Sequence, residues 1–250
     1  MNILNQSVIL LLWNVLLLKK EKIYLIPGLM TDERLWGRVI PLLEDDYELV
    51  HIPIPHTEDF DEIIDILFNL FQEEKVNLLG FSLGGYIASY FAVTYPNRVN
   101  KLFMLAATPG ASNEAEIERR KEKFAVIEKN GFNGLTYEKA KSLVEKQNQN
   151  DEDLIQTIQD MFMDLGKETF ISQLTSTFNR IDLLEDLINL DLPVWFYYST
   201  EDRLLNHNSI KKLLTSKHNI KMISREGSSH NIPLEASDTL NIQIRKWMKT

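Results

Sequence analysis

Short apolar runs alternate with amphipathic stretches along most of the chain. Because strands covered by helices on both faces of a sheet are apolar throughout, such runs predict a mostly parallel β-sheet. The runs are Ile23–Pro27, Glu48–Ile52, Val76–Phe81, Val99–Ala106, Val194–Ser199 and Ile220–Ile223. Apolar residues at three- and four-residue spacing predict helices between them, most clearly over Asp59–Glu74, Gly85–Tyr95 and Pro233–Met248. We therefore expect an α/β fold whose sheet is flanked by helices.

The alternation stops between Pro109 and about Asp191, where the pattern predicts helices and no strand. The predicted helices are Glu114–Asn130, Tyr137–Asn148, Asp151–Leu165 and Lys167–Phe178. An insertion after the strand Val99–Ala106 leaves the sheet at the carboxyl ends of its strands, where ligands bind in open α/β sheets. We expect residues 110–190 to form a helical lid over a core built from residues 22–109 and 191–250.

Residues 1–21 form an N-terminal apolar extension ahead of the first predicted strand. The apolar run 8–18 is shorter than the roughly twenty residues of a membrane-spanning helix. Residues 1–7 contain no Lys or Arg, whereas a secretory signal begins with a basic segment. We expect no membrane association. The run leaves open a signal peptide or membrane anchor, an element packed on the body, or an extension with little structural role.

Composition and charge narrow the classes of partner. A length of 250 residues suits one domain with an insertion. The net charge of −9 repels nucleic-acid phosphates, and no basic stripe interleaved with aromatic residues is present, so we expect no nucleic-acid partner. The chain has no cysteine, which excludes disulfides, thiolate nucleophiles and Cys-ligated zinc. This composition suits a reducing compartment, and we expect a cytoplasmic protein.

The strongest local motif is Gly80-Phe81-Ser82-Leu83-Gly84-Gly85, between a predicted strand and a predicted helix. A serine on a sharp strand-to-helix turn projects its hydroxyl above the sheet, as a nucleophile must. Such a turn needs strained backbone angles and a close approach of strand and helix, which gives glycines 80 and 84 a steric reason. Ser82 is therefore the candidate nucleophile, and the alternative is a glycine-rich helix start with an idle serine.

Serine needs an adjacent base, and His230 is the preferred candidate among five histidines. It lies in a polar loop after the last predicted strand, at the same sheet edge as Ser82. His56 follows the second strand and is the main alternative. His218 precedes the last strand and is expected at the opposite edge, His51 lies within or at the end of a strand, and His207 is too close in sequence to the candidate acid.

A carboxylate must hold the base in the right tautomer, and Asp202 follows the strand Val194–Ser199. The chain order of serine, aspartate and histidine is the one expected for a nucleophile on this kind of turn. Its neighbour Glu201 is a possible substitute, and an ordinary turn or helix-capping aspartate is the alternative interpretation. No carboxylate follows the strand Val99–Ala106, in the segment Ala107-Thr108-Pro109-Gly110.

An oxyanion would need two backbone donors. The first expected donor is the N–H of Leu83, after the candidate nucleophile and at a helix N-terminus. The second is expected from the turn after the first strand, where Gly28 lets the chain bend and the N–H of Leu29 is the candidate.

These motifs together resemble the α/β-hydrolase superfamily over nearly the whole chain after Ile23. The segment Leu25 to Trp36, with Pro27-Gly28-Leu29 followed by Asp32 and Trp36, resembles small bacterial lid-bearing hydrolases. Many relatives have His-Gly at this turn; Pro27 replaces the histidine and leaves the backbone donor in place. The segment from Gln173 to Asp182 is similar to the lid exit of that group. The strands that usually precede the turn are missing or replaced by the apolar N-terminus.

The resemblance implies carboxylesterase-like or thioesterase-like activity, with relatives that include pimeloyl-carrier-protein methyl esterases. We therefore expect a serine hydrolase that cleaves a small-molecule ester or thioester, for example of an acyl chain. The reaction would pass through an acyl-enzyme and need no metal or organic cofactor. Two alternatives use the same fold. One is a receptor that binds a small molecule without hydrolysis, and the other is an acyltransferase or C–C hydrolase with the same triad.

Overall fold

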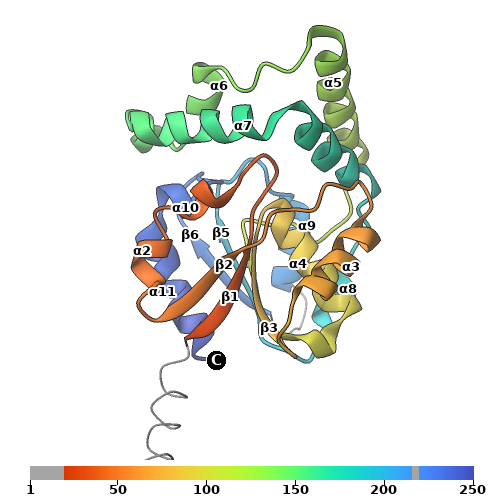
Figure 1. Cartoon of the computed structure of the whole chain (residues 1–250), viewed down its shortest axis with the longest axis vertical. Helices are drawn as coiled ribbons and strands as arrows, with labels where there is room; N and C mark the ends of the chain where they lie inside the picture. Colours follow the sequence, from red (N-terminus) through yellow and green to blue (C-terminus); the bar gives the residue numbers. More distant parts are fainter. Residues whose placement is uncertain (1–19, 216–219) are drawn as a thin grey trace, which may run out of the picture.

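The computed structural model describes residues 20–215 and 220–250, and a parallel sheet of six strands lies at the centre of this part (Figure 1). The strand order is β2-β1-β3-β4-β5-β6, and each neighbouring pair is parallel. The strands are β1 (Glu21–Ile26), β2 (Tyr47–His51), β3 (Val76–Phe81), β4 (Val99–Leu105), β5 (Val194–Ser199) and β6 (Lys221–Arg225). The predicted α/β fold with a parallel sheet is confirmed.

The strand boundaries differ from the sequence prediction by one or two residues, except in β3 and β5. Residues 1–19, which hold most of the predicted N-terminal extension, lie outside the described residues. Glu21 was expected in that extension, but it pairs with Tyr47 as the first residue of β1. Cross-strand pairing therefore extends β1 into polar sequence that has no apolar pattern.

Helices cover both faces of the sheet, and the side chains of β1 alternate between the two cores. Tyr24 and Ile26 pack with α3 (Phe60–Leu70), α4 (Leu83–Thr94), α8 (Leu184–Ile188) and α9 (His207–Thr215). Ile23 and Leu25 pack on the other face. The helices of that face are η1 (Glu33–Trp36), α2 (Ile40–Leu43), α10 (Ile232–Glu235) and α11 (Ser237–Met248). The short η2 (Pro96–Arg98) follows α4.

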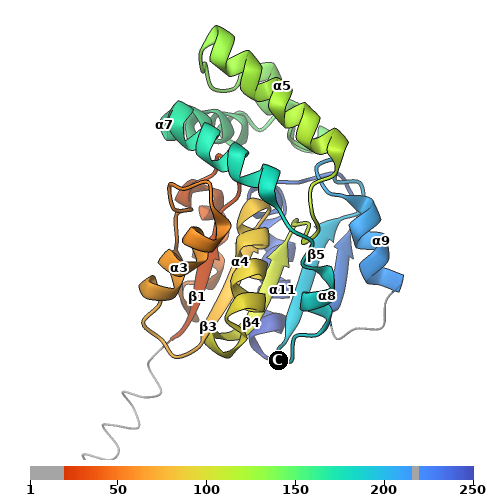
Figure 2. The same ribbon diagram turned by 90° about the vertical axis from the view of Figure 1, so that its right-hand side faces the viewer.

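Most of the segment 110–190 lies across the carboxyl ends of the strands (Figures 1 and 2). Its elements are α5 (Glu114–Asn130), α6 (Tyr137–Lys141), η3 (Lys146–Asn148), α7 (Glu152–Ser176) and η4 (Thr177–Asn179). Within α7, Gly166 has a φ of 74° and breaks the helix. The break falls between the two helices that the sequence predicts, Asp151–Leu165 and Lys167–Phe178. The last helix of the segment, α8, instead packs beside α4 on the face of the sheet.

Several predicted helices are shorter than the apolar pattern suggests. The prediction Asp59–Glu74 was too long, because Asp59 caps α3 and the chain is extended from Phe71. The prediction Tyr137–Asn148 splits into α6 and η3, and Pro233–Met248 splits at Ala236, whose φ of −142° is not helical. Conversely, α4 begins at Leu83, two residues before the predicted start at Gly85. The sequence analysis gives no bounds for η1, α2, α8 and α9, which have four to nine residues each.

Candidate active site

Ser82 lies between β3 and α4 with a φ of 52° and a ψ of −113°. A residue other than glycine rarely adopts a positive φ, and such strain concentrates at functional sites. The backbone N–H of Ser82 donates to the carbonyl of Leu105 at 2.9 Å, which ties the turn to the neighbouring strand. The turn therefore holds the hydroxyl in one place at the carboxyl edge of the sheet.

The glycines around Ser82 are required by close packing of the backbone. A Cβ at Gly80 would lie 2.2 Å from the carbonyl oxygen of Gly84. A Cβ at Gly84 would lie 2.2 Å from the carbonyl oxygen of Pro27 and 2.3 Å from that of Ile26. Neither glycine has a positive φ, so the strained angles expected at these two positions occur at the serine instead. The first turn of α4 thereby packs directly against the ends of β1 and β3.

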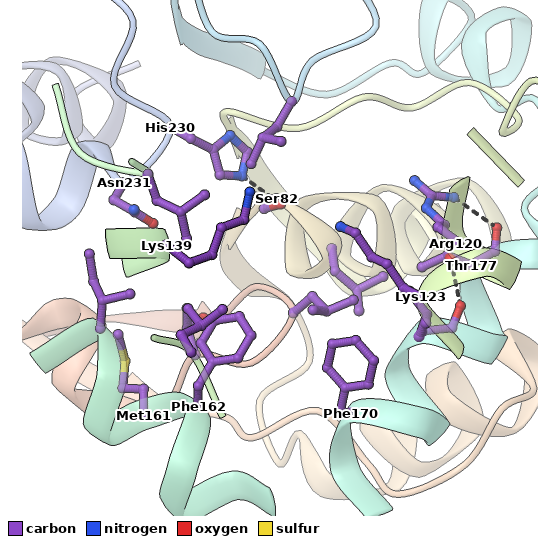
Figure 3. A pocket seen from close by; sticks show the side chains of 18 of the residues that line it. Ser82, Arg120, Lys123, Lys139, Met161, Phe162, Phe170, Thr177, His230 and Asn231 are labelled. Atoms are coloured by element: carbon purple, nitrogen blue, oxygen red, sulfur yellow. Dashed lines mark hydrogen bonds between the residues drawn. The ribbon is translucent and has the colours of Figure 1, made fainter. Parts of the chain in front are cut away.

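Three side chains from distant parts of the chain form a continuous hydrogen-bonded line (Figure 3 shows its first two members). The Oγ of Ser82 lies 2.9 Å from Nε2 of His230, and Nδ1 of His230 lies 2.7 Å from Oδ2 of Asp202. Asp202 is fully buried and the His230 side chain is 13% exposed. A buried carboxylate that accepts from Nδ1–H leaves the lone pair of Nε2 for the hydroxyl proton.

The loop after β5 fixes Asp202 at one end of this line. Its Oδ1 accepts from the N–H of Leu204 at 2.9 Å, so both carboxylate oxygens have donors. Nε2 of His207 lies 2.7 Å from the backbone oxygen of Asp202, which gives that histidine a local contact. Glu201, the possible substitute acid, is exposed.

The other candidate histidines lie away from Ser82 or outside the described residues. His56 is exposed, and its Nε2 lies 3.4 Å from Oγ1 of Thr169 on α7. His51 is the last residue of β2, and its Nε2 lies 3.9 Å from Glu33. His218 lies outside the described residues. Among the histidines that the structure describes, His230 is thus the one placed against the serine hydroxyl.

The two expected oxyanion donors lie on the turns that flank Ser82. Leu83 is the first residue of α4, and Leu29 follows Gly28 in the turn after β1. Both residues line the same cavity as Ser82. Within residues 20–215 and 220–250, neither N–H donates a hydrogen bond to a protein acceptor. Both are therefore free to bind an oxygen at this edge of the sheet.

Two hydrogen bonds hold the turn that carries Leu29. The N–H of Gly28 donates to Oγ1 of Thr31 at 2.7 Å. The N–H of Met30, a residue with a φ of 55°, donates to the buried Oε1 of Gln173 on α7 at 2.8 Å. Sequence reasoning named Gln173 only as the first residue of the segment that is similar to a lid exit, and it assigned this residue no role. Gln173 contacts a turn 143 residues earlier in the chain, and no pattern in the sequence predicts this contact.

A second set of buried polar groups holds the loop of His230. Oε1 of Glu145 accepts from the N–H groups of Ser228 and Ser229 at 2.7 and 2.9 Å, and Glu145 also pairs with Arg225. Burial acts to raise the pKa of Glu145, but the hydrogen bonds from Arg225 and the two backbone N–H groups outweigh it and lower the pKa. Sequence reasoning missed Glu145, because it lies in the helical segment with no motif around it.

Glu235 completes this set at the start of the C-terminal helices. Its Oε2 accepts from the N–H of Glu145 at 2.7 Å, and its Oε1 accepts from the hydroxyl of Ser229 at 2.6 Å. Burial is the main cause that raises the pKa of Glu235. The segment around η3 and the His230 loop are therefore joined through two carboxyl groups.

A cavity of about 770 Å³ opens in front of Ser82, between the sheet edge and helices α5, α6 and α7. Apolar side chains form much of its wall. They include Val126, Ile127, Phe132, Met161, Phe162, Phe170 and Leu174. Such a concave and largely apolar site beside a hydrogen-bonded polar group is typical of small-molecule binding. Within the described residues, no cluster of three or more His, Asp or Glu side chains could hold a metal ion. The helices of this part of the chain also include none with the length and apolar character of a membrane span.

The chain is similar in sequence to proteins of known family. The family model of the alpha/beta hydrolase fold matches residues 26–237. The biotin biosynthesis bifunctional protein BioHC of Teredinibacter turnerae is 28% identical over 88% of this chain and 44% of its own length. The pimeloyl-[acyl-carrier protein] methyl ester esterase of Proteus mirabilis is 31% identical over 40% of this chain and 41% of its own length. The matches thus span less than half of these two relatives.

Solved structures share the fold at low sequence identity. An esterase from Thermogutta terrifontis superimposes with a TM-score of 0.79 at 18% identity, covering 92% of this chain and 90% of the esterase. At this identity the likeness concerns the fold, and the chemistry must be argued from the site itself.

Proposed function

Because the chain belongs to the α/β-hydrolase family, we propose that it is a serine hydrolase that cleaves a carboxylic ester or thioester through an acyl-enzyme. One observation carries this proposal: the line from Ser82 Oγ to His230 Nε2 at 2.9 Å and from His230 Nδ1 to Asp202 Oδ2 at 2.7 Å. Such a line turns an alcohol into a nucleophile by giving its proton a base within hydrogen-bond reach.

In the first step Ser82 Oγ attacks the carbonyl carbon while Nε2 of His230 takes the hydroxyl proton. Asp202 holds Nδ1–H and stabilises the imidazolium that forms, without taking the proton itself. The imidazolium then gives its proton to the leaving alcohol or thiol, and an ester of Ser82 remains. A water deprotonated by His230 attacks this ester, and the acid leaves as Ser82 regains its proton.

The oxyanion of each tetrahedral intermediate would bind the N–H groups of Leu29 and Leu83. Both residues line the cavity beside Ser82, and neither N–H has a protein acceptor among the described residues. Losing one such donor typically costs about 3 kcal/mol of transition-state stabilisation. The hydrogen bond from Met30 N–H to Gln173 supports the backbone orientation at Leu29.

The helical segment acts as a lid in this proposal. Helices α5, α6 and α7 lie over the carboxyl edge of the sheet and supply the apolar wall of the cavity (Figure 1). An apolar wall suits the acyl part of an ester, and enclosure excludes water from the electrostatic contacts at the carbonyl. The relative from Proteus mirabilis is named as a methyl ester esterase, which supports an ester as the substrate.

The test uses a panel of p-nitrophenyl esters and acyl thioesters of increasing chain length, with wild type and Ser82→Ala measured together. Wild type should hydrolyse members of the panel, and a fluorophosphonate probe should label Ser82. Ser82→Ala should lose turnover and labelling while keeping its circular dichroism spectrum. Ser224→Ala, at an exposed serine of the edge strand β6, is the matched control and should behave as wild type. Hydrolysis retained by pure Ser82→Ala protein would refute the proposal, and absent labelling would favour a receptor.

A further inference from the structure

The cavity in front of Ser82 is lined by an unusual number of basic side chains. They are Arg119, Arg120, Lys123, Lys139 and Arg180, against a single acidic residue, Glu122. Arg120 and Arg180 are half-buried, whereas Glu122 and the other three cations are exposed. All five come from the helical segment, and the chain as a whole has a net charge of −9. Figure 3 shows Lys123 and Lys139 extending into the cavity, with Lys139 directed toward Ser82 and His230. Positive charge is thus gathered in this cavity against the overall balance of the chain.

These cations have no carboxylate partners within the described residues, where none of the five forms an ion pair within 4.0 Å. Arg120 donates to two neutral oxygens, the Ser112 hydroxyl at 2.5 Å and the Thr177 carbonyl at 3.4 Å. Arg180 lies over the ring of Tyr86 at 4.6 Å, and its buried Nε has no hydrogen-bond partner. By contrast, Arg34 and Arg38 pair with aspartates at 2.5–2.7 Å.

Glu116, one helical turn before Arg120 on α5, is engaged in the cap of the helix. The Glu116 side chain accepts from the N–H of Asn113 at 3.3 Å, in the capping box that starts the helix. Burial, followed by the charges of Lys139, Arg120 and Arg119, lowers the pKa of Lys123. Burial and the charge of Arg120 lower the pKa of Arg180 to about 10. The positive side chains of the cavity therefore repel one another. An anion bound among them would reduce this electrostatic repulsion.

We propose that the substrate carries an anionic group, a carboxylate or a phosphate, that binds Lys123 together with Arg120 and Arg180 while the scissile carbonyl lies at Ser82. This inference deepens the proposed hydrolase function and rests on it for the position of the carbonyl. Arginine forks fit the paired oxygens of carboxylate and phosphate, and lysine adds a mobile point charge. The apolar wall would contact the carbon chain between the two polar ends.

Substrate preference tests the proposal directly. Three p-nitrophenyl esters of equal chain length are compared, ending in a methyl, a carboxylate or a phosphate group. For wild type, kcat/KM should be about tenfold or more higher for a charged ester than for the methyl-ended one, as expected for a charge-assisted hydrogen bond. The better of the two charged esters identifies the anion. A methyl-ended ester that is hydrolysed as well as both charged ones would overturn the proposal.

Lys123→Met should lower the ratio of charged to methyl-ended kcat/KM by about tenfold. Lys121→Met is the matched control, because Lys121 is exposed on the same helix and does not line the cavity, and it should keep the wild-type ratio. Should Lys123→Met fail to fold, the salt dependence of the wild-type ratio serves instead. The ratio should fall as NaCl is added, and a salt-independent ratio counts against the proposal.

Binding separates this proposal from the hydrolase proposal. Calorimetric titration of adipate and of an alkyl phosphate into Ser82→Ala protein measures the anion site without any turnover. Binding that weakens in the double variant Ser82→Ala/Lys123→Met supports the anion site even if no ester is hydrolysed. Ester hydrolysis without measurable anion binding leaves the hydrolase proposal standing and refutes the anion site.

Discussion

Glu145 and Arg225 form an ion pair in which Oε1 lies 2.9 Å from Nη1, joining the helical segment to the end of β6. Arg225 also donates to the hydroxyl of Ser199 at 2.9 Å, and that hydroxyl donates to the carbonyl of Ser229 at 2.6 Å. The backbone just before His230 is therefore held by side chains from β5, β6 and the helical segment. In this arrangement Glu145 is a positioning residue for the proposed base.

Replacing the carboxylate of Glu145 should loosen this loop. Glu145→Gln removes one charge of a buried pair and leaves Arg225 without its partner, which typically costs about 3 kcal/mol or more of unfolding free energy. We expect kcat to fall about tenfold because His230 is less well held against Ser82. Urea denaturation and ester hydrolysis measure the two effects. Glu138→Gln, exposed on α6, is the control, and equal behaviour of the two variants would contradict the role of Glu145.

The same pair predicts a stability effect in acid. Because hydrogen bonds from Arg225 and two backbone N–H groups outweigh burial, the pKa of Glu145 lies below its ordinary value of 4.5. A carboxyl group with a lowered pKa stabilises the fold above its ordinary value, and this contribution is lost as the pH falls through the lowered value. The difference in unfolding free energy between wild type and Glu145→Gln should shrink below about pH 4.5. A difference that stays constant from pH 7 to acid would refute this.

The proposed role of Asp202 predicts a large loss of rate with little loss of structure. In Asp202→Asn the amide cannot hold His230 in the required tautomer, and kcat should fall by roughly 10³–10⁴, as in serine proteases. Glu201→Gln is the matched control, since Glu201 is the exposed neighbour of the buried aspartate. Steady-state kinetics on a p-nitrophenyl ester would distinguish them. A comparable loss in Glu201→Gln would move the acid to the neighbouring position.

Close backbone packing at Gly84 predicts that alanine is not tolerated there. A Cβ would lie 2.2 Å from the oxygen of Pro27, so α4 or the turn after β1 would have to move, and overpacking of this kind costs about 3 kcal/mol or more. Gly37→Ala is the control, because its Cβ would meet its nearest atom at 3.2 Å and Gly37 has a helical φ of −56°. Thermal denaturation measures both. Equal melting temperatures would show that the turn can yield.

Gln173 should matter for rate through the turn that carries Leu29. Gln173→Met keeps the size of the side chain but removes the acceptor of the Met30 N–H, which leaves a buried donor unsatisfied. We expect kcat to fall about tenfold as the Leu29 N–H shifts from its position. Gln173→Glu retains an acceptor oxygen and should recover much of the activity. If both variants keep the wild-type kcat, the hydrogen bond has no part in positioning the turn.

Much of the fold followed from the pattern of apolar residues. Strands β3 and β5 are apolar over their full length because helices cover both of their faces, and their bounds were predicted to the residue. Polar strand ends were missed, as at Glu21, because cross-strand hydrogen bonds rather than side-chain burial extend β1 there. Short helices such as α2 could not be given bounds, because four residues are too few to show a period.

By itself, the sequence predicted the six strands in their order along the chain and the three candidate side chains, Ser82, Asp202 and His230. It could do so because loops that follow parallel strands all emerge at one edge of the sheet, so chain order alone brings them near one another. Only the tertiary structure decided what surrounds them. Glu145, Gln173 and the unpaired cations of the cavity act across long sequence separations, and their positions depend on how the helical segment folds back over the sheet.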